Sequence, residues 1–381
     1  MTTVDWTARG AAATAREIAQ QPRLWREVAQ DAERDRARTD AFLQPLLAQP
    51  DLRIVLTGAG TSAFAGGLIA PALARTLRRR VEAVPTTDVV SNPAEVFAED
   101  VPTLLVSFAR SGDSPESVAA TALAEQCLSS VHHLVVTCNP EGRLAKEMAG
   151  AERSLVLQMP EAAHDEGFAM TSSFTCMVLA TWLRLAGGDP GVGSAAAAAE
   201  RLLAEHEDDL AALAARGYTR VVYLGSGPLT ALAQESALKM LELTAGSVVA
   251  WFDSALGFRH GPKSVLDDET LTVVLVSTDA YTRQYDEDIA AELLRALDPK
   301  DVLVISAGSP SRLQAPQTWE LPELAGASDV VAGLAYVVVA QLLALHTSLA
   351  LGLTPDNPFP SGEVNRVVQG VTVHPLGGAG A

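Results

Sequence analysis

The chain has 381 residues, of which 48% are hydrophobic and 19% are charged. This length allows two domains or one duplicated domain, and the composition excludes global disorder. Its 28 basic and 46 acidic residues give a formal charge of −18, which argues against a general nucleic-acid binder because affinity for phosphate backbones needs a cationic surface.

The cysteines and the first residues indicate the compartment. Cys127, Cys138 and Cys176 are too few and too far apart for a disulfide framework or a zinc site. The first 21 residues lack a basic start followed by an apolar run, so no secretory signal is expected. Both features fit a reducing cytoplasm.

Residues 1–48 form a predicted N-terminal helical arm. Helix-length segments lie on both sides of Pro22, and the second is charged and amphipathic. The arm is too short for a core of its own. We therefore expect it to pack on the first domain or on a partner subunit.

From residue 49 the pattern changes to short apolar runs separated by alanine-rich helical segments. Continuous apolar strands that alternate with helices indicate a parallel sheet covered on both faces. Five such runs precede a glycine-rich stretch at 187–194, and four more follow it: RIVLTGAG, VEAVPTT, PTLLVSFARSG, HHLVVTCN, SLVLQMP, RVVYLGSG, SVVAWFDS, TLTVVLVST and DVLVISAG.

The two halves repeat one pattern. The segment RIVLTGAGTSAFAGG from Arg53 matches RVVYLGSGPLTALAQ from Arg220 in its β-branched pair, its Gly-x-Gly and its small-residue helix. A repeat of this kind indicates a duplicated α/β domain. We assign the first domain to 49–190 and the second to 195–353. Residues 354–381 are a tail that we expect to cover the site or a subunit interface, with a loose tail as the alternative.

The uncharged run 331–353 is long enough to span a bilayer. It contains Gln341, His346, Thr347 and Ser348, and no basic flank follows it. We interpret it as a buried helix of a soluble fold.

Two loops of the first domain could hold a phosphate. Gly60, Thr61 and Ser62 follow the first buried strand and open a helix, where free N–H groups and hydroxyls can bind an anion. The pattern Gly-x-Gly-x-x-Ala is weak support for a dinucleotide site, because no acidic residue closes the second strand.

The second loop, SFARSGDSPES, also stands between a strand and a helix. Arg110, Ser111 and Ser114 offer three donors in one turn. A helix cap would need one serine only, so the pair of loops indicates one phosphate held from two sides. The hydroxyls of Thr171 and Ser172, at the start of a later helix, could bind sugar oxygens or act only as caps.

The segment 219–264 carries the candidate catalytic groups. Glu235, Lys239 and Glu242 are spaced i, i+4 and i+7, so they lie on one helical face. On a surface this spacing would be a solvated ion pair. Apolar neighbours favour a partly dry carboxylate, which is a candidate proton-transfer base. His260 stands in the turn Arg-His-Gly-Pro and could be a second titrating group or a plain loop histidine.

Together these motifs resemble the tandem sugar isomerase (SIS) family, which includes the isomerase half of glucosamine-6-phosphate synthase. The resemblance is most specific to the AgaS-type branch of tagatose-6-phosphate ketose/aldose isomerases and galactosamine-6-phosphate deaminases. It rests on strings that recur in one order along nearly the whole chain beyond the arm: LTGAGTSAF, TTDVVSNP, SFARSGDSPES, TSSFTCM, GFRHGPKS, YTRQYD and DNPFPSGEVNRVVQGVTVHP.

The resemblance implies two flavodoxin-like three-layer domains and a set of roles. The phosphate loops fall on Thr61, Ser62, Arg110, Ser111 and Ser114, with Gly60 in the first loop. The carboxylate that moves a proton between C1 and C2 falls on Glu242, with Glu235 and Lys239 in support. The ring-opening histidine falls on His260, which in such enzymes often comes from a neighbouring subunit.

One position departs from the family pattern. In the synthase a lysine that forms a Schiff base with the ketose precedes a Val-Thr-Val run, whereas here Gln369 precedes Gly370 and that run. We also expect no glutamine-hydrolysing domain that would deliver ammonia. The departure favours release of ammonia over synthesis of an amino sugar.

The resulting expectation is a deaminase/isomerase that converts galactosamine 6-phosphate to tagatose 6-phosphate and ammonia. Plain aldose/ketose isomerisation and a non-catalytic phosphosugar-binding regulator are the alternatives. We expect a phosphorylated hexose as ligand, a cytoplasmic homo-oligomer, and no cofactor, metal, nucleic acid or membrane partner. The sequence does not decide whether the substrate has the galacto or the gluco configuration. It also does not decide between a dimer and a tetramer.

Overall fold

The computed structural model describes residues 5–187, 191–308, 313, 316–368 and 370–377. They divide into two compact units. The N-sheet unit comprises 28–164, 176–187 and 362–377, and the C-sheet unit comprises 5–27, 165–175 and 188–361 within these described ranges.

The N-sheet unit is built on five parallel strands in the order β2-β1-β3-β4-β5. Every residue of β1 and β3 is buried, as the continuous apolar runs predict for a sheet covered on both faces. The strands are β1 (Arg53–Thr57), β2 (Val81–Ala83), β3 (Thr103–Ala109), β4 (Val131–Thr137) and β5 (Ser154–Gln158).

Helices cover both faces of this sheet. Side chains alternate along each strand, so Val55 and Leu105 join the apolar cluster under α5, α6 and α7, whereas Leu56 contacts α4 near Gly66 on the other face. The helices are α3 (Arg36–Leu47), α4 (Thr61–Leu77), α5 (Thr86–Ser91), α6 (Pro93–Val96), α7 (Pro115–Cys127), α8 (Arg143–Met148), the short η1 (Glu161–Ala163) and, from Cys176 on, α9 (Ser172–Ala186).

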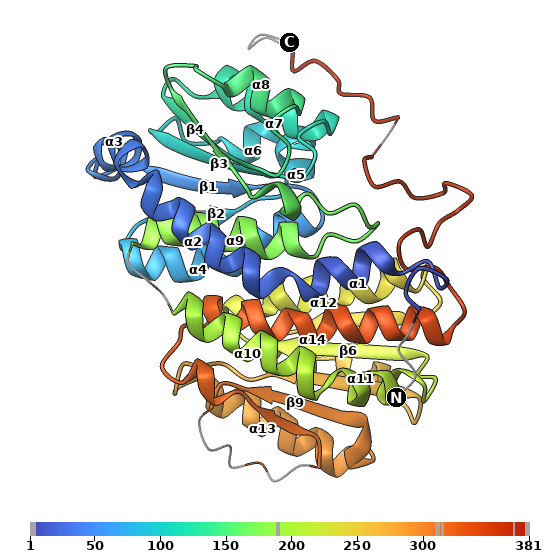
Figure 1. The fold of residues 1–381 in the computed structure, drawn as a ribbon. Helices are drawn as coiled ribbons and strands as arrows, with labels where there is room; N and C mark the ends of the chain where they lie inside the picture. Colours follow the sequence, from blue (N-terminus) through green and yellow to red (C-terminus); the bar gives the residue numbers. More distant parts are fainter. Residues whose placement is uncertain (1–4, 188–190, 309–312, 314–315, 369, 378–381) are drawn as a thin grey trace. The chain divides into compact units, whose positions relative to one another are not determined.

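The C-sheet unit repeats this topology. Its parallel strands have the order β10-β9-β8-β6-β7, which is the order of the N-sheet read from the other edge. The predicted duplication is thereby confirmed (Figure 1). The strands are β6 (Arg220–Gly225), β7 (Val249–Asp253), β8 (Thr270–Leu275), β9 (Val302–Ser306) and β10 (Thr318–Glu320), the last of which the sequence reading missed.

The helices of the C-sheet unit also form two layers. Ile289 and Leu293 of α13 pack on Val222 and other residues of one sheet face, while α12 and α14 lie on the opposite face (Figure 1). The elements are α1 (Ala12–Ala19), α2 (Gln21–Arg34) up to Glu27, α10 (Val192–Glu205), α11 (Glu207–Ala214), α12 (Pro228–Leu243), α13 (Thr282–Ala296), α14 (Asp329–Ala350) and the short η2 (Gly257–Arg259), η3 (Pro262–Val265), η4 (Pro299–Asp301) and η5 (Pro322–Leu324).

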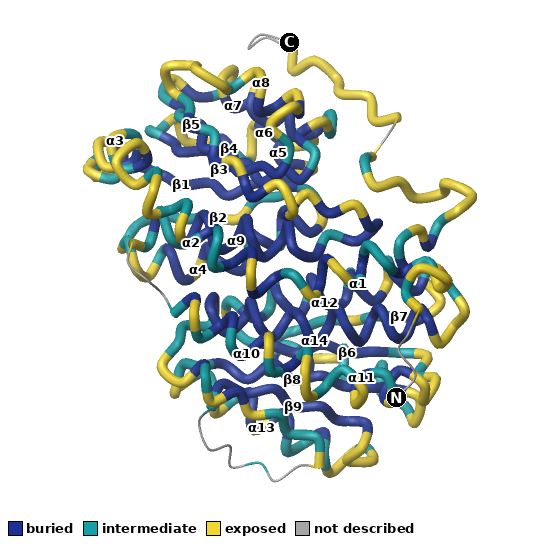
Figure 2. Tube along the Cα trace, in the orientation of Figure 1, coloured by how far each residue is buried: buried dark blue, intermediate teal, exposed yellow. Residues whose placement is uncertain are grey.

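Helix α14 is the predicted buried helix. It is the one helix in the described part of the chain with the length and apolar character to cross a membrane, and 94% of its most apolar window is buried inside the fold. Figure 2 shows it in the colour of buried residues along almost its whole length. The interpretation as a core helix is confirmed.

The described part of the N-terminal arm contains α1, α2 and α3 and is divided between the units, so it does not belong to the first domain alone. Helix α1 and the first turns of α2 belong to the C-sheet unit, where Gln21 donates a hydrogen bond to Gln341 of α14 over 2.7 Å. The rest of α2 and all of α3 belong to the N-sheet unit, where Asp35 pairs with Arg184 at 3.0 Å.

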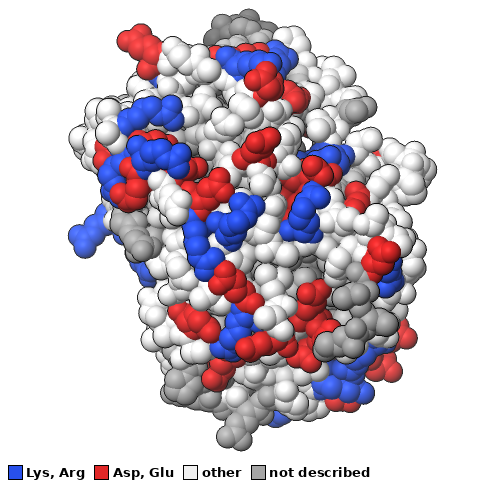
Figure 3. Space-filling model, viewed as in Figure 1, with Lys and Arg blue, Asp and Glu red and all other residues white. Residues whose placement is uncertain are grey.

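Acidic and basic side chains are mixed over the face drawn in Figure 3. Surface pairs include Arg26 with Glu200 at 2.6 Å and Arg23 with Glu27 at 3.3 Å. Pairs this exposed contribute little to stability, about 0–1 kcal/mol each.

Candidate active site

The two predicted phosphate loops are neighbours in the N-sheet unit. Strands β1 and β3 pair directly, with Thr57 opposite Ser107. The loop 58–60 follows β1 and the loop 110–114 follows β3, so both lie at the same edge of the sheet. Strand order reverses between these two strands, and such switch points are where open α/β sheets bind ligands.

Glycines shape the first loop. A side chain on Gly58 would lie 2.6 Å from the backbone of Ser62, and Gly60 has a φ of +54°. Neither position accommodates another residue without strain. The backbone therefore turns tightly from β1 into α4. Gly60 provides no side-chain cap, and the Ser62 and Ala63 N–H groups donate to the carbonyls of Ala59 and Gly60.

The hydroxyl and guanidinium donors of these loops differ in exposure. The side chains of Thr61, Ser62 and Arg110 are buried, whereas Ser111 and Ser114 are partly exposed. The Ser114 hydroxyl accepts from the Ser117 N–H over 3.3 Å and so caps α7. The Ser111 hydroxyl accepts from the Asp113 N–H at 3.3 Å. Helix capping therefore explains Ser114 but not Ser111, which caps none of the described helices.

The C-terminal tail contacts the second loop. Arg110 donates from its Nη2 to the carbonyl of Arg366 over 2.7 Å. The described tail after residue 361 contains no helix or strand. Gln369, where the family pattern has a lysine, lies outside the described residues.

The corresponding corner of the C-sheet is closed by carboxylates. Ser226 donates to Asp286 over 2.5 Å, and the Ser277 N–H donates to the same carboxylate over 2.9 Å. The Thr278 N–H and hydroxyl both donate to Asp329, at 2.6 and 2.9 Å. In the C-sheet, these donors at the strand ends are therefore bonded to carboxylates of the same chain. A phosphate bound at the N-sheet would take the place of such carboxylates at the equivalent corner.

Burial raises the pKa of Asp286 to about 6, even though the bonds from Ser226 and Ser277 lower it. A carboxyl group with a raised pKa binds its proton more tightly in the folded state than in the unfolded one. Its contribution to stability therefore falls as pH rises from about 4 to about 6. Near neutral pH the ionised, buried Asp286 carboxylate therefore lowers the stability of the fold, although its hydrogen bonds connect the two strand ends.

Helix α12 carries the three candidate catalytic groups on one face, as the spacing predicts. Lys239 Nζ lies 3.4 Å from Glu235 Oε1 and forms a closer ion pair with Glu242. Lys239 and Glu235 are fully buried, whereas the Glu242 side chain is 23% exposed. Glu242 is therefore the member of the three that a ligand can reach.

The lysine carries a positive charge in this setting. Burial by itself lowers its pKa, but the nearby Glu235 and Glu242 carboxylates outweigh burial and raise the pKa above its ordinary value. A buried ammonium with two carboxylates fixes the rotamers of both partners. The surface ion-pair interpretation of this spacing is wrong, because the pair lies in the protein interior.

His260 lies in an exposed turn between η2 and η3. The turn is fastened to α13 because Arg259 and Lys263 both pair with Glu292, the first at 2.8 Å. Within the described ranges the imidazole makes no hydrogen bond, and it has none to Glu242. A rigid turn thus presents this side chain to solvent.

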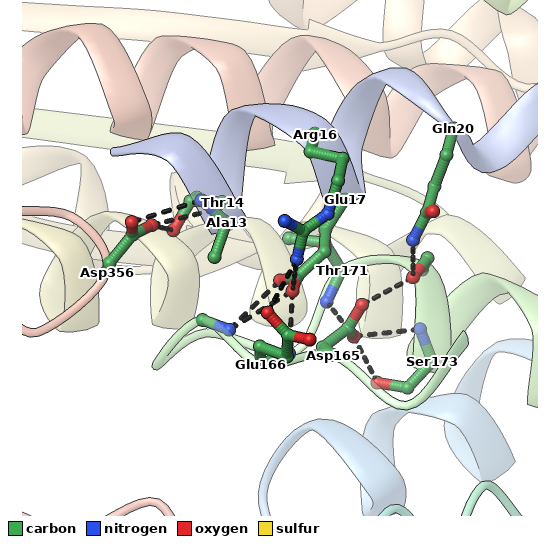
Figure 4. A network of polar contacts seen from close by, with 12 residues as sticks. Ala13, Thr14, Arg16, Glu17, Gln20, Asp165, Glu166, Thr171, Ser173 and Asp356 are labelled. Atoms are coloured by element: carbon green, nitrogen blue, oxygen red, sulfur yellow. Dashed lines mark hydrogen bonds and ion pairs between the residues drawn. The ribbon is translucent and has the colours of Figure 1, made fainter. Parts of the chain in front are cut away.

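Thr171 and Ser172 stand in the loop 164–173, which ends in the first two residues of α9 and which Asp165 organises. Asp165 accepts from the N–H groups of Thr171 and Ser173, both at 2.9 Å, and from the hydroxyls of Ser172 and Ser173 (Figure 4). The Ser172 hydroxyl is therefore used inside the loop. The Thr171 hydroxyl is buried and has no hydrogen-bond partner among the described residues.

The predicted site residues fall into two groups. Gly60, Thr61, Ser62, Arg110, Ser111 and Ser114 belong to the N-sheet unit, and Thr171, Ser172, Glu235, Lys239, Glu242 and His260 belong to the C-sheet unit. Sequence reasoning missed Asp165, whose position just before a cluster of hydroxyls could have suggested a cap, and Glu17, for which no local signal exists. In the described ranges no three His, Cys, Asp or Glu side chains form a group that could hold a metal ion.

The SIS domain family matches this chain twice, over residues 46–186 and 216–351. The chain is 59% identical over 368 residues to a Streptomyces coelicolor protein whose name assigns it provisionally as the D-galactosamine-6-phosphate deaminase AgaS, with 95% of each chain covered. It is 46% identical over 373 residues to the D-galactosamine-6-phosphate deaminase AgaS of Shewanella sp. ANA-3, which covers 97% of this chain and 94% of that one.

A solved structure agrees. The crystal structure of tagatose-6-phosphate ketose/aldose isomerase from Escherichia coli matches with a TM-score of 0.88 and 43% identity, over 95% of this chain and 96% of that chain. Both matched segments contain a five-stranded parallel sheet and the loops described above. The chain therefore belongs to the SIS domain family, in its tandem two-domain form.

Proposed function

We propose that the chain is a galactosamine-6-phosphate deaminase that forms tagatose 6-phosphate and ammonia. The observation that carries the proposal is the similarity along nearly the whole chain, at 46% identity, to a protein named for this activity. The partly exposed carboxylate of Glu242 beside a buried lysine supplies a group suited to the chemistry.

The proposed reaction moves one proton and adds one water. His260 assists opening of the sugar ring, and Glu242 removes the proton from C2 of the open aldehyde. The resulting enolamine takes a proton at C1 from the same carboxylate, which leaves an imine at C2. Water hydrolyses this imine to the ketone and ammonia, so substrate plus water equals ketose plus ammonia. General acid–base groups of this kind each contribute about 10²- to 10⁴-fold to the rate.

The phosphate of the substrate would bind at the switch point of the N-sheet. The positive end of the α4 dipole, the hydroxyls of Thr61, Ser62, Ser111 and Ser114, and the Arg110 guanidinium are the groups proposed to bind it. Thr171, Ser172, Glu235 and Lys239 are proposed to support the sugar and the carboxylate. Closure of the equivalent corner in the C-sheet by Asp286 and Asp329 favours a single phosphate position per chain.

A substrate panel separates this function from its alternatives. The protein is incubated with galactosamine 6-phosphate, glucosamine 6-phosphate and galactose 6-phosphate, and ammonia and ketose are measured. A deaminase releases ammonia from an amino sugar, with the galacto compound preferred. Ketose from galactose 6-phosphate alone would indicate the plain isomerase, and binding without any product would indicate a regulator.

The catalytic unit is proposed to be a homo-oligomer. Four large apolar side chains are exposed on and beside the edge strand β7, close in sequence to His260: Leu241, Val249, Trp251 and Leu256. An exposed edge strand of this kind is a common site of subunit contact. In an oligomer His260 can serve the active site of a partner.

Subunit complementation tests this arrangement. If His260 acts across subunits, a mixed oligomer of Glu242→Gln and His260→Ala chains contains some sites with both native groups. We expect each variant alone to lose most ammonia release and the refolded mixture to recover a measurable part of it. Equal inactivity of the mixture, with mixed oligomers demonstrated by mass spectrometry, would mean that both groups come from one chain.

The proposed compartment is the cytoplasm. Cys127, Cys138 and Cys176 form no disulfide in the described part of the chain, and two of them are buried. Reduced cysteines in a sugar-phosphate enzyme are what an intracellular setting favours.

A further inference from the structure

The N-terminal helix α1 reaches the loop 164–173 through one carboxylate. Glu17 is 1% exposed, and its Oε1 accepts from the Glu166 N–H over 2.6 Å. Both of its oxygens lie 3.2 Å from the Gly167 N–H. Figure 4 shows this carboxylate of α1 pointing at the loop backbone.

The contact is close enough to restrict the sequence of the loop. A side chain on Gly167 would lie 2.9 Å from Glu17 Oε2 and 2.9 Å from Thr14 Oγ1. The loop backbone therefore lies directly against α1. The start of α1 is fixed in turn, because Asp356 accepts from the N–H groups of Ala13 and Thr14 at 3.0 and 2.8 Å.

Two further bonds, from Gln20 at the end of α1 and from Trp25 of α2, reach the end of this loop and the first turn of α9. Gln20 donates to the Ser172 hydroxyl over 3.1 Å, and Trp25 donates to Thr175 over 2.9 Å. The loop thus has two supports. Asp165 bonds to residues 171–173, and side chains of the arm bond to Glu166, Gly167 and Ser172. Between them stands Thr171, whose buried hydroxyl has no hydrogen-bond partner in the part of the chain that the structure describes.

We propose that Glu17 is a positioning residue for substrate binding, which fixes the loop 164–173 so that Thr171 and its backbone can contact the sugar of the bound hexose phosphate. This role rests on the proposed function. Glu17 itself does not touch the substrate. Its effect passes through the N–H groups of Glu166 and Gly167.

The charge environment gives this carboxylate a distinct pH signature. Burial, then the Asp165 carboxylate, raises the pKa of Glu17 to about 7, against the opposing N–H donors and the exposed Arg16. Glu166 and Arg16 pair with each other at 2.8 Å on the solvent side. Protonation below this pKa turns one acceptor oxygen into a donor, which weakens the hold on the loop as pH falls.

The test uses Glu17→Gln with Arg16→Ala as its matched control. Glutamine keeps the shape of the side chain but faces one N–H group with its own NH₂. A contact made equally in the ground state and the transition state changes KM and not kcat, so we expect Glu17→Gln to raise KM for galactosamine 6-phosphate about 10-fold with kcat within about twofold. Arg16→Ala removes the exposed pair with Glu166 and a 3.4 Å contact with Glu17, but it leaves both loop N–H groups bonded to Glu17, so its KM above pH 7 should stay within about twofold of the wild type.

Two further readouts separate positioning from a loss of fold. The wild-type KM should rise as pH falls below about 7, and Glu17→Gln should lack this step; comparing the two cancels the titration of the substrate phosphate. The dissociation constant for tagatose 6-phosphate, measured by calorimetry, should weaken by the same factor as KM. A variant that is merely less stable would lose active protein and kcat, and that outcome would overturn the proposal.

The outcomes also distinguish this inference from the proposed function. If the wild type turns over and Glu17→Gln has the KM and dissociation constant of Arg16→Ala, the positioning role is wrong and the function stands. If the wild type releases no ammonia but Glu17→Gln still weakens tagatose 6-phosphate binding, the role stands and the proposed reaction fails. A wild type that binds no phosphosugar overturns both.

Discussion

Replacing Glu242 with glutamine should reduce ammonia release by about 10²- to 10⁴-fold, the range that one general acid–base group contributes. Glutamine has the same size but cannot take a proton from carbon. Lys239 remains buried beside it and Glu235 still balances the ammonium, so the fold should be retained. Turnover is measured with galactosamine 6-phosphate at saturation.

Affinity supplies the second half of this prediction. Tagatose 6-phosphate should bind Glu242→Gln with an unchanged dissociation constant, because the proposed phosphate donors belong to other loops. Glu205→Gln is the control, since that glutamate is 60% exposed in a surface pair with Arg201. A Glu242→Gln enzyme with a rate within about tenfold of the wild type would show that another group moves the proton.

Replacing Lys239 with methionine should destabilise the C-sheet unit by about 3–5 kcal/mol, as expected when one partner of a buried ion pair is removed. Glu235 is fully buried and would have to be accommodated without its nearest cation. Glu242 would lose the contact that fixes its rotamer, so kcat should fall as well. Urea denaturation at several pH values measures the first effect.

The pH dependence and a second variant test the electrostatic cause. In Lys239→Met the buried Glu235 would be favoured in its protonated form, so its folded-state pKa would exceed the unfolded value of about 4.3. The difference in stability from the wild type should then widen as pH rises above that value. Glu235→Leu added to Lys239→Met should restore part of the loss, whereas Lys300→Met, which removes a 57% exposed lysine, should cost about 0–1 kcal/mol. A pH-independent difference would indicate a packing defect.

Most of the architecture could be predicted from local patterns. Nine strands coincide with the apolar runs, and the two Gly-x-Gly turns adopt one conformation, with φ near +54° at Gly60 and +59° at Gly227. The missed strand β10 has three residues, of which Trp319 is the one large apolar residue. Among the described strands it pairs only with β9, at the sheet edge, so tertiary context and not periodicity creates it.

The candidate site was predictable where its residues are adjacent along the chain. The common face of Glu235, Lys239 and Glu242 follows from helix geometry, but the full burial of the lysine depends on the packing of α12 beneath α14 and on the sheet. The carboxylate of Asp286 reaches Ser226 across 60 residues, and Glu17 reaches Gly167 across 150. No local pattern encodes such pairs, because the fold alone brings them together.

The most direct test of the proposed chemistry is a product balance. Wild-type protein is incubated with galactosamine 6-phosphate, and ketose and ammonia are quantified in the same sample by NMR and enzymatic detection. We predict tagatose 6-phosphate and ammonia in equal amounts, and neither product above background with Glu242→Gln. Ketose without ammonia, or no conversion of the amino sugar by the wild type, would contradict this account.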